Sequence, residues 1–336
     1  MRLLHLLLLL CTLLSSCGGD NRDFLDDRAG LLDKPSRERL IAYHRALLED
    51  FNIHCKLVVL EEASFDINRD AAELFGDLGR KTGSARGVLF VVDPAGREVR
   101  IEVGYDLEDI FPDIFIGYLE REQMLPFFGQ NRIGDGIEAT EELLAARIQR
   151  SMAGKTFDPS VELGRSDRFS GGGGARSEAA IGEGTLDKTA ATAPDAWRPG
   201  ETPEDSLAVY MRLLRQKIKD PNLALYAPAT RKFLAGWVVT DAQQDNELHT
   251  LERAKIDRVV VAGNLAVIRF PIQERMLPPY FLERTNEGWA FDFSGMSAYI
   301  QLNAHNMWHF VKQDHRYMFA FSDWQFDANG YPQSTQ

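Results

Sequence analysis

The chain has 336 residues, of which 44% are hydrophobic and 26% charged. This composition is typical of a globular protein with at least one hydrophobic core and excludes a disordered or collagen-like chain. The length favours two domains. The formal net charge of −12 argues against a nucleic-acid-binding surface, which needs clustered Lys and Arg, and three cysteines are too few for a disulfide framework.

The N-terminal segment has the pattern of a secretion signal. Met1-Arg2 precedes an apolar run over 3–14, which is too short to span a membrane, and Leu14-Ser15-Ser16 leads directly into Cys17. This arrangement resembles a bacterial lipobox. The resemblance implies that residues 1–16 are a signal peptide, that Cys17 carries acyl chains such as palmitate, and that 17–23 is a tether. An ordinary signal peptide with an incidental cysteine is the alternative.

Lipidation would place the protein in the bacterial cell envelope, anchored to a membrane through Cys17 and facing the periplasm. Several acyl chains give stable anchoring, because each buried CH₂ contributes about 0.8 kcal/mol. Gly18-Gly19 follow the cysteine without an aspartate at the next position. By resemblance to enterobacterial lipoproteins, this favours the outer membrane over the inner one.

Residues 24–150 alternate between helical and strand-like periodicity. The pattern predicts helices over 36–52 and 68–80, strands over 53–60, 87–92 and 99–103, and mainly helices from there to 150. We therefore expect an α/β fold in which helices sandwich a small mixed sheet.

A stretch rich in Gly, Ala and Thr, 151–200, predicts a flexible linker, and periodicity resumes over 201–330. Helices are predicted over 205–218, 229–234 and 301–313, and strands over 249–261, 264–272, 279–285, 288–294 and 317–326. Short links favour an antiparallel meander in an α+β domain that folds independently of the first. Helices wrapped by such a sheet resemble the cone of the nuclear-transport-factor and ketosteroid-isomerase superfamily, over about 200–296.

Several blocks in the first domain resemble the TPM domain family. The matching text is Asp27-Arg28-Ala29-Gly30-Leu31-Leu32, the apolar run 87–92, Arg100-Ile101-Glu102-Val103-Gly104-Tyr105-Asp106-Leu107-Glu108, then Asp113, Pro126-Phe127-Phe128 and 134–137. The resemblance implies a compact α/β sandwich. The family includes a thylakoid-lumen protein reported as an acid phosphatase and many bacterial envelope proteins, and some members bind calcium in an acidic groove. Arg86, Asp106 and Pro112 depart from the usual pattern.

Acidic residues crowd the end of the second strand of the predicted hairpin. Asp106, Glu108, Asp109 and Asp113 lie within eight positions, and Asp27 could join them if the fold brings its turn close. Crowded carboxylates repel one another unless a hard cation such as Ca²⁺ or Mg²⁺ neutralises them. The sequence thus predicts metal ligands at Asp27, Asp106, Glu108 and Asp113, of which the family pattern retains Asp27 and Asp113. A solvated acidic rim is the alternative.

Familiar catalytic signatures are absent from the sequence. It has no Gly-x-Ser-x-Gly elbow and no His-Glu-x-x-His motif. His54 and Cys55 are neighbours in a predicted strand, so they face opposite sides, and Cys55 is expected to be a small core residue. We therefore expect no nucleotide or organic cofactor and assign no catalytic residue.

The leading hypothesis is a lipid-anchored TPM-domain protein that needs a divalent cation to bind or assemble envelope protein complexes. A weak metal-dependent phosphatase, with Asp27 and Asp113 holding the metal, is the alternative.

Overall fold

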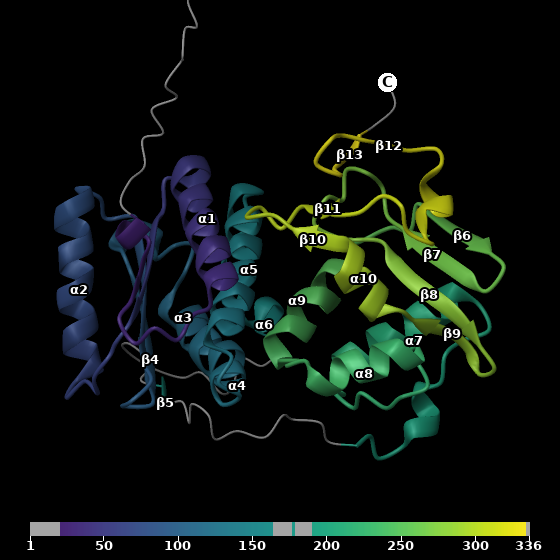
Figure 1. The fold of residues 1–336 in the computed structure, drawn as a ribbon, viewed down its shortest axis with the longest axis horizontal. Coiled ribbons are helices and arrows are strands. Elements are labelled where there is room, and N and C mark those ends of the chain that lie inside the picture. Colours follow the sequence, from purple (N-terminus) through teal and green to yellow (C-terminus); the bar gives the residue numbers. More distant parts are fainter. Residues whose placement is uncertain (1–20, 164–176, 179–189, 334–336) are drawn as a thin grey trace, which may run out of the picture.

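The computed structural model describes residues 21–163, 177–178 and 190–333. The first half is a sheet with helices on both faces (Figure 1). Its strands are β1 (Leu25–Asp27), β2 (His54–Val59), β3 (Gly87–Asp93), β4 (Glu98–Val103) and β5 (Ser177–Glu178), in that spatial order. β1, β2 and β3 are parallel, whereas β4 is antiparallel to both of its neighbours. The predicted small mixed sheet is confirmed.

Two helices connect the parallel strands on opposite faces of the sheet. α1 (Lys34–Phe51) begins at Asp33, whose carboxylate accepts from the Ser36 N–H, and ends at Asn52 in the left-handed conformation. α2 (Ile67–Thr82) begins at the Asp66 N-cap. Figure 1 shows α2 on one face and α1 with α5 (Ile133–Met152) on the other. The helices predicted over 36–52 and 68–80 are confirmed.

The segment between β4 and α5 is mostly helical but irregular. A 3₁₀ turn, η2 (Tyr105–Leu107), precedes α3 (Asp113–Tyr118), a π-helical segment η3 (Leu119–Met124) and the short α4 (Leu125–Phe128). Buried side chains from this segment, including Phe111, Leu119 and Phe127, complete the core on the α5 side of the sheet.

The second half contains helices and an antiparallel sheet. Its helices are α7 (Pro203–Arg215), α8 (Pro228–Gly236), α9 (Asp241–Leu251) and α10 (Phe293–Tyr299). The sheet is a meander of β6 (Arg258–Ala262), β7 (Leu265–Arg269), β8 (Tyr280–Thr285) and β9 (Gly288–Phe291). The predicted meander is confirmed, whereas the strand expected to begin at 249 is wrong, because α9 continues to Leu251.

The C-terminal prediction of a helix over 301–313 is also wrong. This segment holds β10 (Ile300–Leu302) and β11 (Trp308–Phe310), which pair antiparallel. Asn303 closes the turn, because its side-chain oxygen accepts from the backbone N–H groups of His305 and Met307. The strand expected over 317–326 is instead η6 (Met318–Phe321) followed by β12 (Gln325–Phe326), which pairs with β13 (Pro332–Gln333).

About half of the predicted linker lies outside the described residues. Of the described parts, α6 (Pro159–Glu162) follows α5, β5 pairs with β4, and η5 (Pro194–Trp197) buries Trp197 in the core of the second half. Across the described ranges, no helix is both long and apolar enough to span a membrane.

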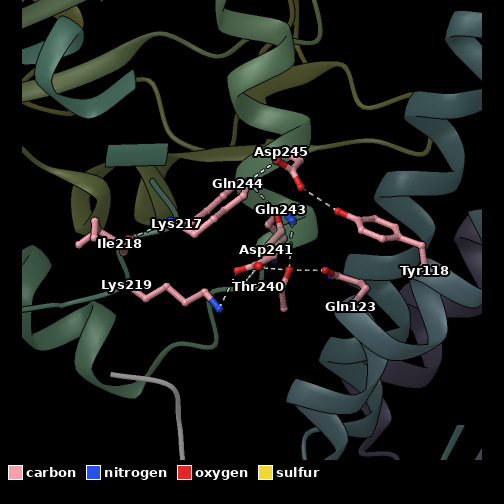
Figure 2. Close-up of polar contacts among 10 residues, drawn as sticks. All are labelled: Tyr118, Gln123, Lys217, Ile218, Lys219, Thr240, Asp241, Gln243, Gln244 and Asp245. Carbon is pink, nitrogen blue, oxygen red and sulfur yellow. Dashed lines mark hydrogen bonds and ion pairs between the residues drawn. The ribbon is translucent and has the colours of Figure 1, made fainter. Parts of the chain in front are cut away.

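The two halves are in direct contact through α9 (Figure 2). Tyr118 donates to Asp245 at 3.0 Å, and the Thr240 hydroxyl donates to the Gln123 side-chain oxygen. Val238 and Ala242 are buried in the same hydrophobic cluster as the core of the first half. The expectation of two independent domains did not include this interface.

Candidate functional site

The predicted acidic residues occupy two different ends of the first sheet. Asp27 ends β1 opposite Val59, the last residue of β2. Gly104, which follows β4, donates to the Gly87 carbonyl at the first residue of β3, opposite His54. Five strand steps separate His54 from Val59, or about 17 Å at roughly 3.3 Å per residue. The fold therefore does not bring Asp27 to Asp106 and Glu108.

Asp27 organises the turn that leads into α1. Its Oδ1 accepts from the Leu31 N–H at 3.1 Å and its Oδ2 from the Leu32 N–H at 3.0 Å. Arg37 lies 3.4 Å from Oδ2, and the Asp27 side chain is shielded from solvent. Both carboxylate oxygens already have partners within the protein. This geometry gives Asp27 a structural role, which is to hold the turn before α1.

The 106–109 carboxylates lie on a turn with a well-defined backbone. Gly104 starts it, and a Cβ there would lie 1.9 Å from the Ala85 carbonyl oxygen, so only glycine fits. The Leu107 N–H donates to Gly104 at 2.8 Å, the Phe111 N–H donates to Leu107 at 2.8 Å, and the Leu107 side chain is fully buried. The buried leucine anchors a turn whose acidic residues point outward.

Three carboxylates, an arginine and a tyrosine line a recess of about 390 Å³ on this turn. They belong to Asp106, Glu108, Asp109, Arg86 and Tyr105. The three acidic residues are exposed, and Tyr105 is 79% exposed. With one positive and three negative side chains, the recess carries a formal charge of about −2 at neutral pH.

Arg86 and Asp106, two of the three departures from the family pattern, contact each other. The Arg86 guanidinium donates to the carbonyl oxygens of Asp106, Phe51 and Asn52, at 3.3, 3.3 and 3.2 Å. The arginine thus ties the acidic turn to the C-terminal end of α1 through backbone atoms. This leaves the three carboxylates directed toward solvent.

Asp113 lies outside this recess. It is exposed in the first turn of α3, directly after the Pro112 N-cap. Cys17, the predicted lipidation site, lies outside the described residues.

A second group of ligand-type side chains lies inside the core. His44 from α1, Cys55 from β2 and Glu141 from α5 place their donor atoms within 4.8 Å of one another, and all three residues are buried. His44 Nε2 lies 2.5 Å from Glu141 Oε1, and Nδ1 lies 3.0 Å from the Phe24 carbonyl oxygen. The predicted burial of Cys55 is confirmed, but its polar surroundings were not predicted.

Electrostatics couple the members of this buried group. Burial alone would lower the pKa of His44, but the negative charges that Cys55 and Glu141 can carry raise it well above its ordinary value. Burial raises the pKa of Glu141, opposed by His44, and burial also raises that of the Cys55 thiol. The geometry supports a protonated His44 paired with an ionised Glu141 beside a neutral thiol.

The buried group could hold a metal, and its chemistry differs from that of the acidic recess. Imidazole, thiolate and carboxylate together suit Zn²⁺ or a similar transition metal, whereas Ca²⁺ and Mg²⁺ prefer oxygen ligands alone. The sequence held one signal for this group. His44 lies four residues after Leu40 and three before Leu47, both buried, and so shares the inward stripe of α1.

Comparison with known proteins identifies the first half. A family model described as the TPM domain matches residues 25–147, so the chain contains a TPM domain, as the sequence blocks indicated. Among solved structures, the chain is similar to the N-terminal domain of a protein from P. gingivalis, determined by NMR in solution. The two are 23% identical, the match covers 41% of this chain and 89% of that chain, and the TM-score is 0.33. No curated protein matches the chain.

Proposed function

We propose that this TPM-domain protein is a lipid-anchored component of the bacterial cell envelope that binds a divalent cation and, with it, a protein partner. The observation that carries the proposal is the recess on the 104–111 turn. There, Asp106, Glu108 and Asp109 project from a backbone fixed by Gly104 and Leu107.

Carboxylates held this way favour a hard cation. Their mutual repulsion is relieved when Ca²⁺ or Mg²⁺ binds, and a backbone that is already ordered reduces the entropic cost of binding. Among the described residues, no ion pair joins Arg86 to these three carboxylates. Two or three protein carboxylates with water should give a modest affinity, on the order of 10⁻⁴ M.

A role in binding a protein fits this surface better than a role in catalysis. Tyr105 stands 79% exposed at the edge of the recess, and aromatic side chains of this kind are enriched where proteins meet. A bound cation with open coordination positions could accept oxygen ligands from a partner. Anchoring through Cys17 would hold this surface close to a membrane, where it could assist the assembly of envelope protein complexes.

Phosphate-ester hydrolysis is the alternative function of the same surface. A recess of about −2 charge repels a phosphate group, so this activity would require a bound metal that polarises a phosphoryl oxygen. The structure does not favour the metal-ligand pair of Asp27 and Asp113 that the sequence suggested. The Asp27 carboxylate oxygens already accept hydrogen bonds within the turn before α1.

We also propose that the second half has the cone-like arrangement that its sequence pattern suggested. Helices α7, α8 and α9 pack together with the β6–β9 meander, and residues from all three helices and from β8 line one cavity. We propose that this half is an accessory ligand-binding unit.

Thermal unfolding with and without 10 mM CaCl₂ tests the cation. At about 100 times the dissociation constant, binding to the native state contributes about 2.7 kcal/mol and should raise the Tm by a few degrees. Asp106→Asn combined with Glu108→Gln should abolish the shift. Glu62→Gln, a change at an exposed position elsewhere in the domain, should preserve it. An equal shift in the double variant would contradict the proposed site.

The enzymatic alternative is tested in the same samples. Hydrolysis of p-nitrophenyl phosphate that requires Ca²⁺ or Mg²⁺ and disappears in the double variant would favour the phosphatase. A cation-dependent Tm shift without hydrolysis would favour the binding function.

A further inference from the structure

A second cavity, of about 350 Å³, lies where the two halves of the chain meet. Its walls come from α7, α8, α9, β8 and α10 of the second half and from α5 of the TPM domain. Met276 and Leu302, which are 42% and 39% exposed, belong to its lining and connect it with the surface. This cavity is separate from the acidic recess; it is the cavity of the accessory ligand-binding unit proposed above, and the inference rests on that part of the proposed function by naming the class of ligand.

Aromatic side chains form much of the wall. Tyr226, Phe233, Trp237 and Phe293 line the cavity, and Phe233 stacks on Trp237 with ring centroids 5.4 Å apart. Aromatic faces carry partial negative charge and attract cations, which is the basis of the aromatic cages that hold quaternary ammonium groups. The wall therefore suits either an apolar molecule or an organic cation.

Three carboxylates line the cavity, and two of them distinguish between these ligands, because the oxygens of the third, Asp220, accept from the backbone N–H groups of Ala191 and Asn222. Glu247 of α9 receives hydrogen bonds from the hydroxyls of Tyr280, at 2.5 Å, and Tyr210, at 2.9 Å. Glu142 of α5 also lines the cavity, and its side chain is exposed there. The two tyrosines fix the position of Glu247, so one acidic group is preorganised against the aromatic wall.

Positive groups near the cavity are already paired with other residues. Lys219 lines the cavity and forms an ion pair with Asp241 at 2.9 Å, and Arg132, which lies over Trp237, pairs with Asp135 at 2.7 Å. Among the described residues, no ion pair joins Glu247 or Glu142 to a basic side chain. The cavity thus holds two carboxyl groups without a basic partner among the described residues.

We propose that this cavity binds a small organic cation, an ammonium group attached to an apolar body. The ammonium group would lie near Glu247 and Glu142 against the aromatic faces, and the apolar body would contact Leu214 and Met276. A carboxylate ligand would be repelled. A neutral ligand would leave the carboxylates partly desolvated without a counter-charge, which costs binding free energy.

Because Glu142 belongs to the TPM domain and Glu247 to the second half, the complete site exists only when the two halves are in contact.

Three probes of the same size and different charge test the proposal on the full chain. They are 4-phenylbutylammonium, 4-phenylbutanol and 4-phenylbutyrate, titrated by calorimetry at pH 8. We expect the ammonium to bind at least tenfold more tightly than the alcohol, and the carboxylate to bind most weakly. Equal affinity for the ammonium and the alcohol, or no binding of the ammonium, would overturn the proposal.

Two substitutions locate the binding. Glu247→Gln keeps the side-chain shape, and Glu142→Gln changes an exposed residue, so we expect both variants to fold. Each should weaken ammonium binding at least fivefold and leave alcohol binding nearly unchanged. Glu204→Gln, on the exposed surface of α7, is the matched control and should have no effect. Unchanged ammonium affinity in both cavity variants, with native Tm values, would overturn the assignment.

Discussion

The Tyr118 hydroxyl donates to Asp245 Oδ2 at 3.0 Å and so connects α3 of the TPM domain with α9 of the second half (Figure 2). Asp245 also pairs with Lys217. Burial, together with the neighbouring Asp245 charge, raises the pKa of Tyr118, so the phenol stays protonated and can donate throughout the neutral range.

Tyr118→Phe should therefore destabilise the chain by about 1–2 kcal/mol, because a hydrogen bond to a charged group is lost while Lys217 still compensates Asp245. Urea unfolding of the full chain measures the loss. Tyr105→Phe, at an exposed tyrosine, is the control and should change stability by less than about 0.5 kcal/mol. Equal effects of the two substitutions would show that the Tyr118 contact does not stabilise the interface.

The buried pair of His44 and Glu141 predicts a pH-dependent effect. In the native protein the raised pKa of His44 contributes stability that is fully present below its unfolded value, about 6.5, and is lost as pH rises through the folded value. In Glu141→Gln, burial dominates and should lower the pKa of His44, so the folded variant is destabilised as pH falls below about 6.5. The loss of stability should be larger at pH 5.5 than at pH 8.

Urea unfolding of both proteins at the two pH values measures this difference. Glu49→Gln, at an exposed position of the same helix α1, is the control and should show no such trend. A loss of equal size at both pH values would mean that His44 is not held protonated by Glu141.

Much of the fold was predictable because its periodicity is local. The stripes of α1 and α2 and the apolar run of β3 are complete within single segments. The helix predicted over 301–313 is wrong because Trp308 and Phe310 alternate as in a strand, a signal too short to outweigh a helical pattern. β1 has only three residues and gives almost no periodic signal.

The candidate sites were also predictable only where their residues are close in sequence. Asp106 and Glu108 are close in sequence, so their shared recess was predictable, whereas the position of Asp27 depends on the register between β1 and β2. The His44 and Glu141 pair spans 97 residues, and only packing of α1 against α5 brings the two together. The same holds for the cavity around Glu247, whose lining comes from both halves.

The N-terminal prediction concerns anchoring. Cys17→Ser should prevent lipidation, leaving a protein that is either uncleaved or released from the membrane. Membrane fractionation and incorporation of radiolabelled palmitate measure the two properties. A variant that fractionates and incorporates label as the native protein does would contradict lipidation at Cys17.

Anomalous diffraction from crystals soaked in Mn²⁺, used in place of Ca²⁺ or Mg²⁺, tests the central claim most directly. The account predicts an anomalous peak in the recess, within about 2.0–2.6 Å of carboxylate oxygens of Asp106, Glu108 or Asp109. Absence of a peak there at 10 mM Mn²⁺, or a peak only at the buried His44, Cys55 and Glu141 group, would contradict it.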